Sequence, residues 1–499
     1  MSRLLCLWAI CCLAFSGARG AVYYVDAQAG RDNASGTSAT SAWQTLPRVN
    51  AMTFAPGDTL LFKRGCSWSG QLAPRGSGQA GKVITIDAYA KGSLPQLNGN
   101  GFVESTLVLS EQSYWSVNNL EITNDGATPA VRSGVYIQVV NNVCTGITLR
   151  GLFVHHVNGI AAWGNDKWNN AGIRLSLWQD PPTRPLTALH DVLVEGCTVQ
   201  DVHAIGILML SNSTTKNRQV VISKNLVNRT GADGIIVQQA ANPHIVGNRC
   251  YYAGKLANDF QYIAGIWTMA CESALVEKNE VAFTQGQVTN GQIFYGDSTA
   301  FDIDNGETGI PCIQGNYSHN NVGGFVLVMS GAQFEKAIIR YNVSVNDGHT
   351  NCGGGATLDV HHGKVFIEHN VFFNNTRDGL VIADTPDTVY RNNIFSVTGP
   401  CNYGTHPQYS HNCFWGSAPT VDDPEKILAD PLFVHPGSNA FGMATCRGYQ
   451  LQQTSPCRGR GMALSAHGDM DFFGNLLADD ACDIGAHAVS SQVGAPGRK

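Results

Sequence analysis

A short pattern built around asparagine recurs along the chain, and no other feature of the sequence constrains the fold as strongly. An apolar residue is followed three positions later by asparagine in seven copies, which contain Asn225, Asn248, Asn279, Asn316, Asn342, Asn370 and Asn393. An earlier copy carries Cys197 in the asparagine position. The asparagines are 23 to 37 residues apart, which suits coils of three short strands joined by turns of variable length. Stacked asparagine side chains can satisfy turn amides that would otherwise be buried and unpaired, so we predict a structural ladder.

A second repeat, glycine followed by a short alternating strand, lies between the copies of the first. Successive side chains of a strand point to opposite faces. We predict that the inward side chains stack from coil to coil at Ile207, Ile235, Ile266, Phe301, Phe325 and Leu380. The outward side chains then form a stripe, which comprises Leu208, Ile236, Trp267, Asp302, Asp304 and Val326 and continues on the next coil with Thr357, Asp359 and His361.

Helical periodicity occurs in one segment, Ala42–Met52, where Ser41 and Gln44 have the spacing of a capping box. A short helix there would cover the open edge of the first coil, where unpaired strands invite aggregation. The sequence therefore predicts an all-β protein, a parallel β-helix with a short N-terminal capping helix.

Composition and charge narrow the class of protein. Of the 499 residues, 43% are hydrophobic and 14% are charged, so the chain can bury a large core. The formal net charge of −6 provides no basic surface for phosphates, and we expect no nucleic-acid partner.

The first residues have the pattern of a secretory leader, because the apolar run Leu4–Phe15 follows Arg3 and precedes small residues up to Gly20. No later stretch approaches the roughly 20 apolar residues of a membrane-spanning helix. We expect a secreted protein, periplasmic or extracellular after removal of the leader. The expected parts are the leader (1–20), an N-terminal cap with the first coils (21–105), a central β-helix with the site (106–400), and the last coils with a C-terminal cap (401–499).

The cysteine count agrees with export. Three of the fifteen cysteines lie in the leader, and the remaining twelve form an even set for an oxidising compartment, in which disulfides persist. Close spacing predicts that Cys401 pairs with Cys413 and Cys446 with Cys457. No group of cysteines and histidines has the spacing of a zinc site.

Three segments carry a family resemblance. They are the mature start, with Tyr23-Tyr-Val-Asp-Ala27 and Phe62-Lys-Arg-Gly65, the middle, with Asp297–Asp304 and Asn316-Tyr-Ser-His319, and the end, with Asp430-Pro-Leu-Phe433 and Asp483-Ile-Gly-Ala486. With these segments the chain resembles the secreted right-handed β-helix proteins that act on carbohydrates, in the pectate-lyase-like superfamily of glycoside hydrolases and polysaccharide lyases. The resemblance implies a right-handed solenoid and a polysaccharide or oligosaccharide substrate.

Asp302 and Asp304 are the strongest candidates for chemistry on the predicted stripe. Aspartate is disfavoured in strands, and two like charges two positions apart repel, so a role should offset the cost. Hydrolysis of a glycosidic bond usually needs one carboxylic acid and one carboxylate. A Ca²⁺ site is the alternative role, with Asp297 and Glu307 as further ligands. A purely structural role in turns is the third interpretation.

Other candidate residues surround this pair in the predicted stripe or nearby. Trp267 is predicted either to stack on a sugar ring or to be buried under a loop. His319 and His361 are possible proton carriers, although histidine is more often a satisfied turn residue. Arg174 is predicted to hold an acidic sugar or to be solvated on the surface.

Three functions follow from these candidates. We rank a glycoside hydrolase first, with Asp302 as base or nucleophile and Asp304 or Asp359 as acid, and with no required cofactor. A Ca²⁺-assisted polysaccharide lyase ranks second, because the stripe offers no lysine and a base would have to come from a loop. A non-catalytic carbohydrate-binding or adhesive solenoid is the third.

Overall fold

The computed structural model describes residues 20–160, 165–179, 186–257, 262–289, 292–294, 297–348, 356–361, 363–464, 468–477 and 483–488. The predicted leader lies outside these residues, except for Gly20. None of the helices in this part of the chain is long and apolar enough to cross a membrane.

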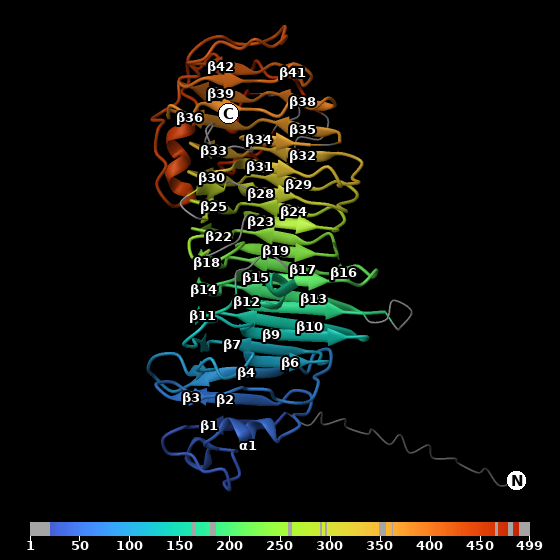
Figure 1. Ribbon diagram of the computed structural model, residues 1–499, viewed down its shortest axis with the longest axis vertical. Coiled ribbons are helices and arrows are strands. Elements are labelled where there is room, and N and C mark those ends of the chain that lie inside the picture. Colours follow the sequence, from blue (N-terminus) through green and yellow to red (C-terminus); the bar gives the residue numbers. More distant parts are fainter. Residues whose placement is uncertain are drawn as a thin grey trace, which may run out of the picture.

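The chain winds into a tall parallel β-helix (Figure 1), and its first wall is a 14-stranded parallel sheet, which we call sheet 1. Its strands, in order along the axis, are β1 (Val22–Val25), β2 (Thr59–Lys63), β4 (Ile84–Tyr89), β7 (Trp115–Asn118), β10 (Val143–Arg150), β13 (Ala188–Glu195), β17 (Val220–Ser223), β21 (His244–Val246), β24 (Leu275–Glu277), β29 (Cys312–Gln314), β32 (Ala337–Arg340), β35 (Val365–Glu368), β38 (Thr388–Arg391) and β41 (Gln408–Ser410).

Sheet 2 follows sheet 1 in each coil and has 13 strands. They are β3 (Ser67–Ser69), β5 (Gln96–Asn98), β8 (Glu121–Asn124), β11 (Phe153–Val157), β14 (Thr198–Val202), β18 (Leu226–Thr230), β22 (Arg249–Tyr251), β25 (Glu280–Ala282), β30 (Tyr317–His319), β33 (Val343–Val345), β36 (Val371–Asn374), β39 (Ile394–Val397) and β42 (Cys413–Trp415).

Sheet 3 completes the coil and has nine strands. They are β6 (Ser105–Ser110), β9 (Ser133–Val140), β12 (Ala171–Trp178), β15 (Ile205–Ser211), β19 (Ile235–Gln238), β23 (Ile263–Met269), β28 (Asp297–Ile303), β31 (Gly324–Val328) and β34 (Leu358–Val360). Small pairs and helices decorate the coils, namely β16 (Asn217–Arg218), β20 (Ala240–Ala241), β26 (Gln287–Thr289), β27 (Gln292–Phe294), β37 (Leu380–Val381), β40 (Cys401–Asn402), η1 (Ala39–Ser41), α1 (Leu46–Asn50), η2 (Asn165–Asn169) and η3 (Met443–Tyr449).

The predicted asparagine ladder is confirmed, at the turn between sheets 1 and 2. The side chain of Asn248 accepts from the backbone N–H of Asn225 at 3.0 Å and from its Nδ2 at 2.9 Å, and Asn279 accepts in the same way from Asn248. The ladder continues past Asn393 to Asn412 and ends on the carboxylate of Asp423. Because every rung is buried, each side chain satisfies amides that water cannot reach.

The inward column is confirmed for most coils and is wrong by one residue at β31. Strand pairing aligns Ile207, Ile235, Ile266 and Phe301 and then continues to Val326, which was predicted outward. The backbone N–H groups of Phe325 and Val326 both donate to the carbonyl of Thr357, so this strand carries an extra residue, as in a β-bulge. Both side chains are therefore buried in the core, and Leu327 takes the outward position.

The glycines that begin the sheet 3 strands are required by close packing. A Cβ atom on Gly206 would lie 2.4 Å from Cγ1 of Val227 and 2.6 Å from the carbonyl oxygen of Gly234. The strand enters the corner with sheet 2 so closely that a side chain does not fit there.

The capping helix is confirmed, but it is shorter than predicted. Helix α1 begins at Leu46, and the hydroxyl of Thr45, rather than Ser41, accepts from the backbone N–H of Arg48. Pro47 lacks an N–H group and is tolerated only in the first turn of a helix, so the helix cannot begin as early as residue 42.

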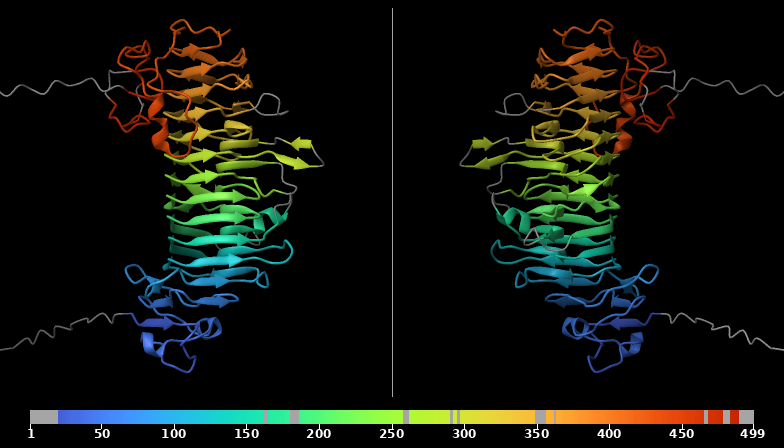
Figure 2. Two further views of the ribbon diagram at one scale, coloured as in Figure 1. Left: turned by 90° about the vertical axis from the view of Figure 1, so that its left-hand side faces the viewer. Right: turned by 90° about the vertical axis from the view of Figure 1, so that its right-hand side faces the viewer.

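The C-terminal segment folds back along the outside of sheet 2, where η3 lies beside β30, β33 and β36 (Figures 1 and 2). The predicted cysteine pairs are not formed: the ten cysteines of the described residues are free thiols. The fully buried Cys413 instead makes a side-chain hydrogen bond with Cys457, which comes from this segment. Sequence spacing misled the prediction because the returning segment brings distant residues together.

Candidate active site

The outward stripe predicted from the sequence lies on sheet 3. Strand pairing places its members in one row, in the order Tyr136, Arg174, Leu208, Ile236, Trp267, Asp302, Leu327 and Asp359. The first acidic residue of the row, Asp302, lies on β28. The structure therefore confirms the position of Asp302 on the stripe.

A cavity of about 340 Å³ opens at this point of the stripe, and we call it the acidic cavity. Its floor comes from the ends of β23 and β28, and its side from η2. Figure 2 shows η2 on the same side of the solenoid as the projecting β26–β27 hairpin and opposite the C-terminal segment. The lining residues are Lys167, Trp168, Asp233, Tyr262, Ala264, Trp267, Met269, Asp297, Asp302, Asp304, Asn305 and Met329.

Asp302 is a buried carboxyl group of the cavity, with a relative exposure of 7%. Its Oδ1 atom has no hydrogen-bond partner among the described residues. Burial, followed by the charges of Asp304, Asp297 and Asp233, raises the pKa of Asp302 well above its usual value. Asp302 consequently binds its proton more tightly than a solvent-exposed aspartate does.

Asp304 is more accessible than Asp302 and is held by its neighbour. Burial raises its pKa, and hydrogen bonds from the backbone N–H and Nδ2 of Asn305, both 2.6 Å from Oδ1, oppose that rise. Donors directed at a carboxylate favour its charged form. Of the two, Asp304 is therefore the better candidate for an ionised carboxylate.

Asp297 enters the cavity through an irregularity that the sequence pattern did not reveal. Asp297 and Ser298 have φ angles of 33° and 48°, and the pairing of β28 with β23 shifts register at this place. A bulge of this kind redirects a side chain, and left-handed backbone in non-glycine residues is characteristic of functional sites. Burial, followed by the charges of Asp233 and Asp304, raises the pKa of Asp297 to about 6.

Two charged residues of the cavity were not identified from the sequence. Lys167 of η2 and Asp233 form an ion pair of 3.1 Å in which the side chains are 5% and 2% exposed. Asp233 also accepts from the backbone N–H of Ala264 at 2.9 Å and from Nε1 of Trp267 at 3.0 Å. Asp233 immediately precedes a glycine-led strand, and this position in the repeat could have identified it as a candidate. No local sequence feature distinguishes Lys167.

Trp267 lies under a loop, which was one of the two predictions for it. It is 5% exposed, and the ring of Trp168 contacts it edge-on at 6.1 Å between centroids. The ammonium group of Lys167 lies 5.7 Å from its ring centroid. Trp267 thus forms a wall of the acidic cavity, while the partly exposed Trp168 covers it.

The remaining candidates do not join the acidic cavity. Arg174 lies four strands away along the stripe, at about 19 Å for the usual strand spacing. Asp359 lies two strands beyond Asp302 and binds His361 at 2.8 Å. His319 is on sheet 2, fully buried beside Glu280 at 3.3 Å and under Phe441 of the C-terminal segment.

The four residues considered for Ca²⁺ are not arranged as one ligand set. Glu307 is fully buried outside the cavity lining, and its Oε1 atom accepts from the backbone N–H of Cys271 at 3.1 Å. Within the described ranges, no three His, Cys, Asp or Glu side chains are placed to hold a metal ion.

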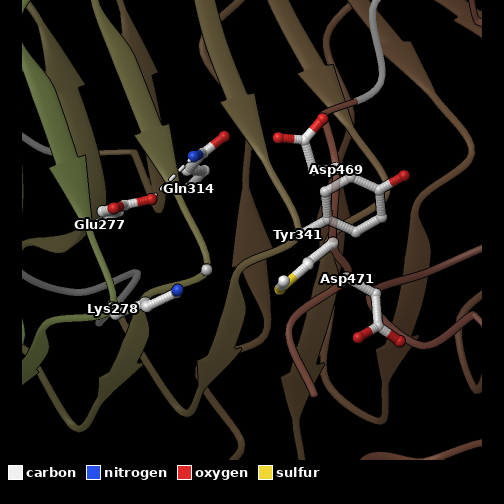
Figure 3. Close-up of a pocket in the computed structure, with 8 residues that line it drawn as sticks. Glu277, Lys278, Gln314, Tyr341, Asp469 and Asp471 are labelled. Carbon is white, nitrogen blue, oxygen red and sulfur yellow. Dashed lines mark hydrogen bonds between the residues drawn. The ribbon is translucent and has the colours of Figure 1, made fainter. Parts of the chain in front are cut away.

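A separate cavity of about 210 Å³ lies where the C-terminal segment crosses the turn between sheets 1 and 2 (Figure 3). Glu277 and Lys278 lie on one side of it in this view, and Tyr341, Asp469 and Asp471 lie on the other. Its carboxylates serve local structure, because Asp471 accepts from Asn475 and Glu277 from Gln314.

The fold and the acidic cavity define a parallel β-helix with a carboxyl-rich pocket on its outer face. A family model described as "Right handed beta helix region" matches residues 98–250. A lacto-N-biosidase from Bifidobacterium longum subsp. longum is 26% identical over 75% of this chain, which spans only 29% of the length of that protein.

Solved structures agree on the architecture. The crystal structure of a GH136 lacto-N-biosidase from Eubacterium ramulus has a TM-score of 0.59 and 23% identity, and the match covers 78% of this chain and 67% of that one. A complex of XylC with xylose has a TM-score of 0.51 and 10% identity, with 94% and 98% covered. These comparisons confirm the right-handed β-helix and the predicted resemblance to carbohydrate-active members of that fold.

Proposed function

We propose that this protein is a glycoside hydrolase whose active site is the acidic cavity. The observation that carries the proposal is the convergence of Asp297, Asp302 and Asp304 in one pocket beside tryptophan. The sequence relationship to a lacto-N-biosidase supports hydrolysis over elimination. The substrate class is an oligosaccharide or polysaccharide, and glycosides of lacto-N-biose are the first to test.

The environments of the carboxyl groups suggest their roles. Asp297, with a pKa raised to about 6, keeps enough of its protonated form to donate a proton to the leaving oxygen. Asp304, whose charged form is favoured by the two hydrogen bonds from Asn305, serves as the base or nucleophile. Asp302 lies behind both and, when protonated, stabilises the carboxylate of Asp304. This differs from the expectation that Asp302 itself is the base or nucleophile.

The lyase alternative is weaker, although a loop does bring a lysine into the cavity. The side chain of Lys167 is in an ion pair with Asp233, and an ammonium group cannot accept a proton. An export leader at residues 1–20 remains part of this proposal, since extended polysaccharides are degraded outside the cell.

The test is an assay of the purified protein on a panel of neutral and acidic glycans, including a chromogenic lacto-N-biose glycoside. New reducing ends are measured together with the absorbance of unsaturated uronate. We expect reducing ends without that absorbance, and a loss of at least 1000-fold in kcat for Asp297→Asn and for Asp304→Asn. Asp359→Asn is the matched control from the same stripe and should retain activity.

Other outcomes would redirect the proposal. Unsaturated product would identify a lyase. Binding of glycans without turnover across the panel would identify a binding solenoid. Full activity of both cavity variants, with loss in Asp359→Asn, would assign the acid to Asp359, two coils further along the stripe.

A further inference from the structure

A second cavity lies on the outward face of sheet 3, nearer the N-terminus than the acidic cavity. Its volume is about 460 Å³, and we call it the arginine cavity. It is lined by Gln71, Glu104, Ser105, Val108, Val131, Tyr136, Gln138, Asn169 and Arg174. Amides, a hydroxyl, an aromatic ring and a cation thus meet at one place, which is a set of groups suited to a sugar.

Arg174 is buried with unused hydrogen-bonding capacity. It is 5% exposed, and its Nη1 and Nη2 atoms donate to the backbone carbonyl and Oδ1 of Asn169 at 3.1 and 2.9 Å. Its guanidinium carbon lies 4.3 Å from the ring centroid of Tyr136. The buried Nε–H has no acceptor among the described residues. The guanidinium of a residue that lines the cavity is therefore held in place by Asn169 and Tyr136 and retains a donor without a partner among the described residues.

The positive charge of Arg174 is poorly compensated. No carboxylate of the described residues lies within 4.0 Å of it, and burial lowers the pKa of Arg174. The acidic residue that interacts electrostatically with Arg174 is Glu104, which is exposed at the rim of the cavity and forms no ion pair with it. An anion bound against Arg174 would offset the cost of burying this cation more than a hydroxyl would.

The two cavities share one loop and one row of side chains. Lys167 and Trp168 line the acidic cavity, and the next residue, Asn169, lines the arginine cavity. Arg174 and Asp302 belong to the same outward row, about 19 Å apart. Leu208 and Ile236, which lie between them in the row, are buried, so a saccharide that reached both cavities would have to pass over the residues that cover this part of the row.

We propose that the arginine cavity is a distal subsite for an acidic sugar unit, whose carboxylate is bound by Arg174. The role of this subsite in turnover depends on the proposed hydrolase function, whereas the binding of an acidic sugar to it does not. The protein would then prefer glycans that carry a uronate or another carboxylated sugar several units away from the cleaved bond.

Titration of the full chain with D-galacturonate and with D-galactose, followed by NMR, tests the proposal. The two sugars differ only in a carboxylate and a hydroxymethyl group. We expect galacturonate to bind at least tenfold more tightly than galactose. Arg174→Met should remove this preference, and its thermal unfolding is measured alongside because Arg174 also anchors Asn169.

Glu104→Gln is a second variant that leaves the core intact, because Glu104 is exposed. Removing its negative charge should strengthen galacturonate binding two- to fivefold and leave galactose unchanged. Equal binding of the two sugars would overturn the proposal, as would galacturonate binding that neither variant alters. A protein that hydrolyses no glycan yet binds galacturonate through Arg174 would refute the proposed function and retain this subsite.

Discussion

Four carboxyl groups line the acidic cavity, and among Asp297, Asp302 and Asp304 the local surroundings determine how readily each gives up its proton. Asp304 receives two hydrogen bonds from Asn305, whereas Asp302 has an unpartnered oxygen and Asp297 faces the carboxylate of Asp233. When neighbouring carboxyl groups lie in different environments, their pKa values differ, and one site can then supply both an acid and a base.

The pH dependence of hydrolysis tests the role of Asp297. We expect kcat/KM to fall about tenfold per pH unit above pH 6 as Asp297 loses its proton. Asp233→Asn removes a charge that raises the pKa of Asp297, so the falling limb should move to lower pH. An unchanged limb in this variant would contradict the assignment, and Asp359→Asn serves as the control.

The buried side chain of Glu307 makes the stability of the folded protein depend on pH. Burial raises its pKa from 4.5 to about 7, so the folded state binds the proton more tightly than the unfolded state. The contribution of Glu307 to stability should accordingly be fully present below pH 4.5 and be lost as the pH rises to about 7, by on the order of 3 kcal/mol.

Glu307→Gln keeps the acceptor for Cys271 and removes the titration. Urea unfolding of the variant between pH 4.5 and 8 should lack this loss, while the exposed Glu425→Gln should behave as the wild type. A variant curve parallel to that of the wild type would show that Glu307 is not the responsible group.

The ladder is the element that stacks one coil on the next. Asn279 accepts from the backbone N–H and Nδ2 of Asn248 and donates to the carbonyl of Ile245 at 2.9 Å. Asn279→Ala should lower the free energy of unfolding by about 3 kcal/mol, because it leaves buried backbone groups unpaired. Denaturant unfolding measures this loss, and the exposed Asn33→Ala should change it by less than about 0.5 kcal/mol.

The elements of the solenoid were largely predictable, and those of the site were only partly so. The asparagine spacing and the glycine-led strands are local and periodic, and they placed Trp267 and Asp302 on the outward stripe. The bulges at Asp297 and Phe325 break that period. Strand alternation alone therefore missed the entry of Asp297 into the cavity and wrongly placed Val326 on the outward face.

At the scale of the whole molecule, the C-terminal segment covers sheet 2. Phe441 packs against Tyr251 at 4.5 Å between ring centroids, and the backbone N–H of Gly442 donates to Glu280 at 2.7 Å. His319 is buried beneath this segment, which explains why a histidine that seemed suited to proton transfer serves packing.

The thiols of Cys413 and Cys457 join the same segment to the last coil. In an oxidising medium we expect them to form a disulfide, with a thiol oxidase or O₂ accepting the two electrons and two protons. Peptide mapping without reductant should identify a Cys413–Cys457 peptide, and reduction should cost about 2–4 kcal/mol of stability. A Cys401–Cys413 peptide would contradict this pairing, and Cys401→Ser should leave it intact.

The sequence by itself determined the parallel β-helix, its asparagine ladder and the outward position of Asp302, because these follow from repeats whose period is that of the backbone. Only the tertiary structure decided which groups meet in the acidic cavity. Lys167, Asp233 and Asp297 come from three different coils and loops, and their approach depends on stacking and on bulges rather than on local pattern. The Cys413–Cys457 contact has the same origin, since packing of the returning chain, not separation in sequence, brings these residues together.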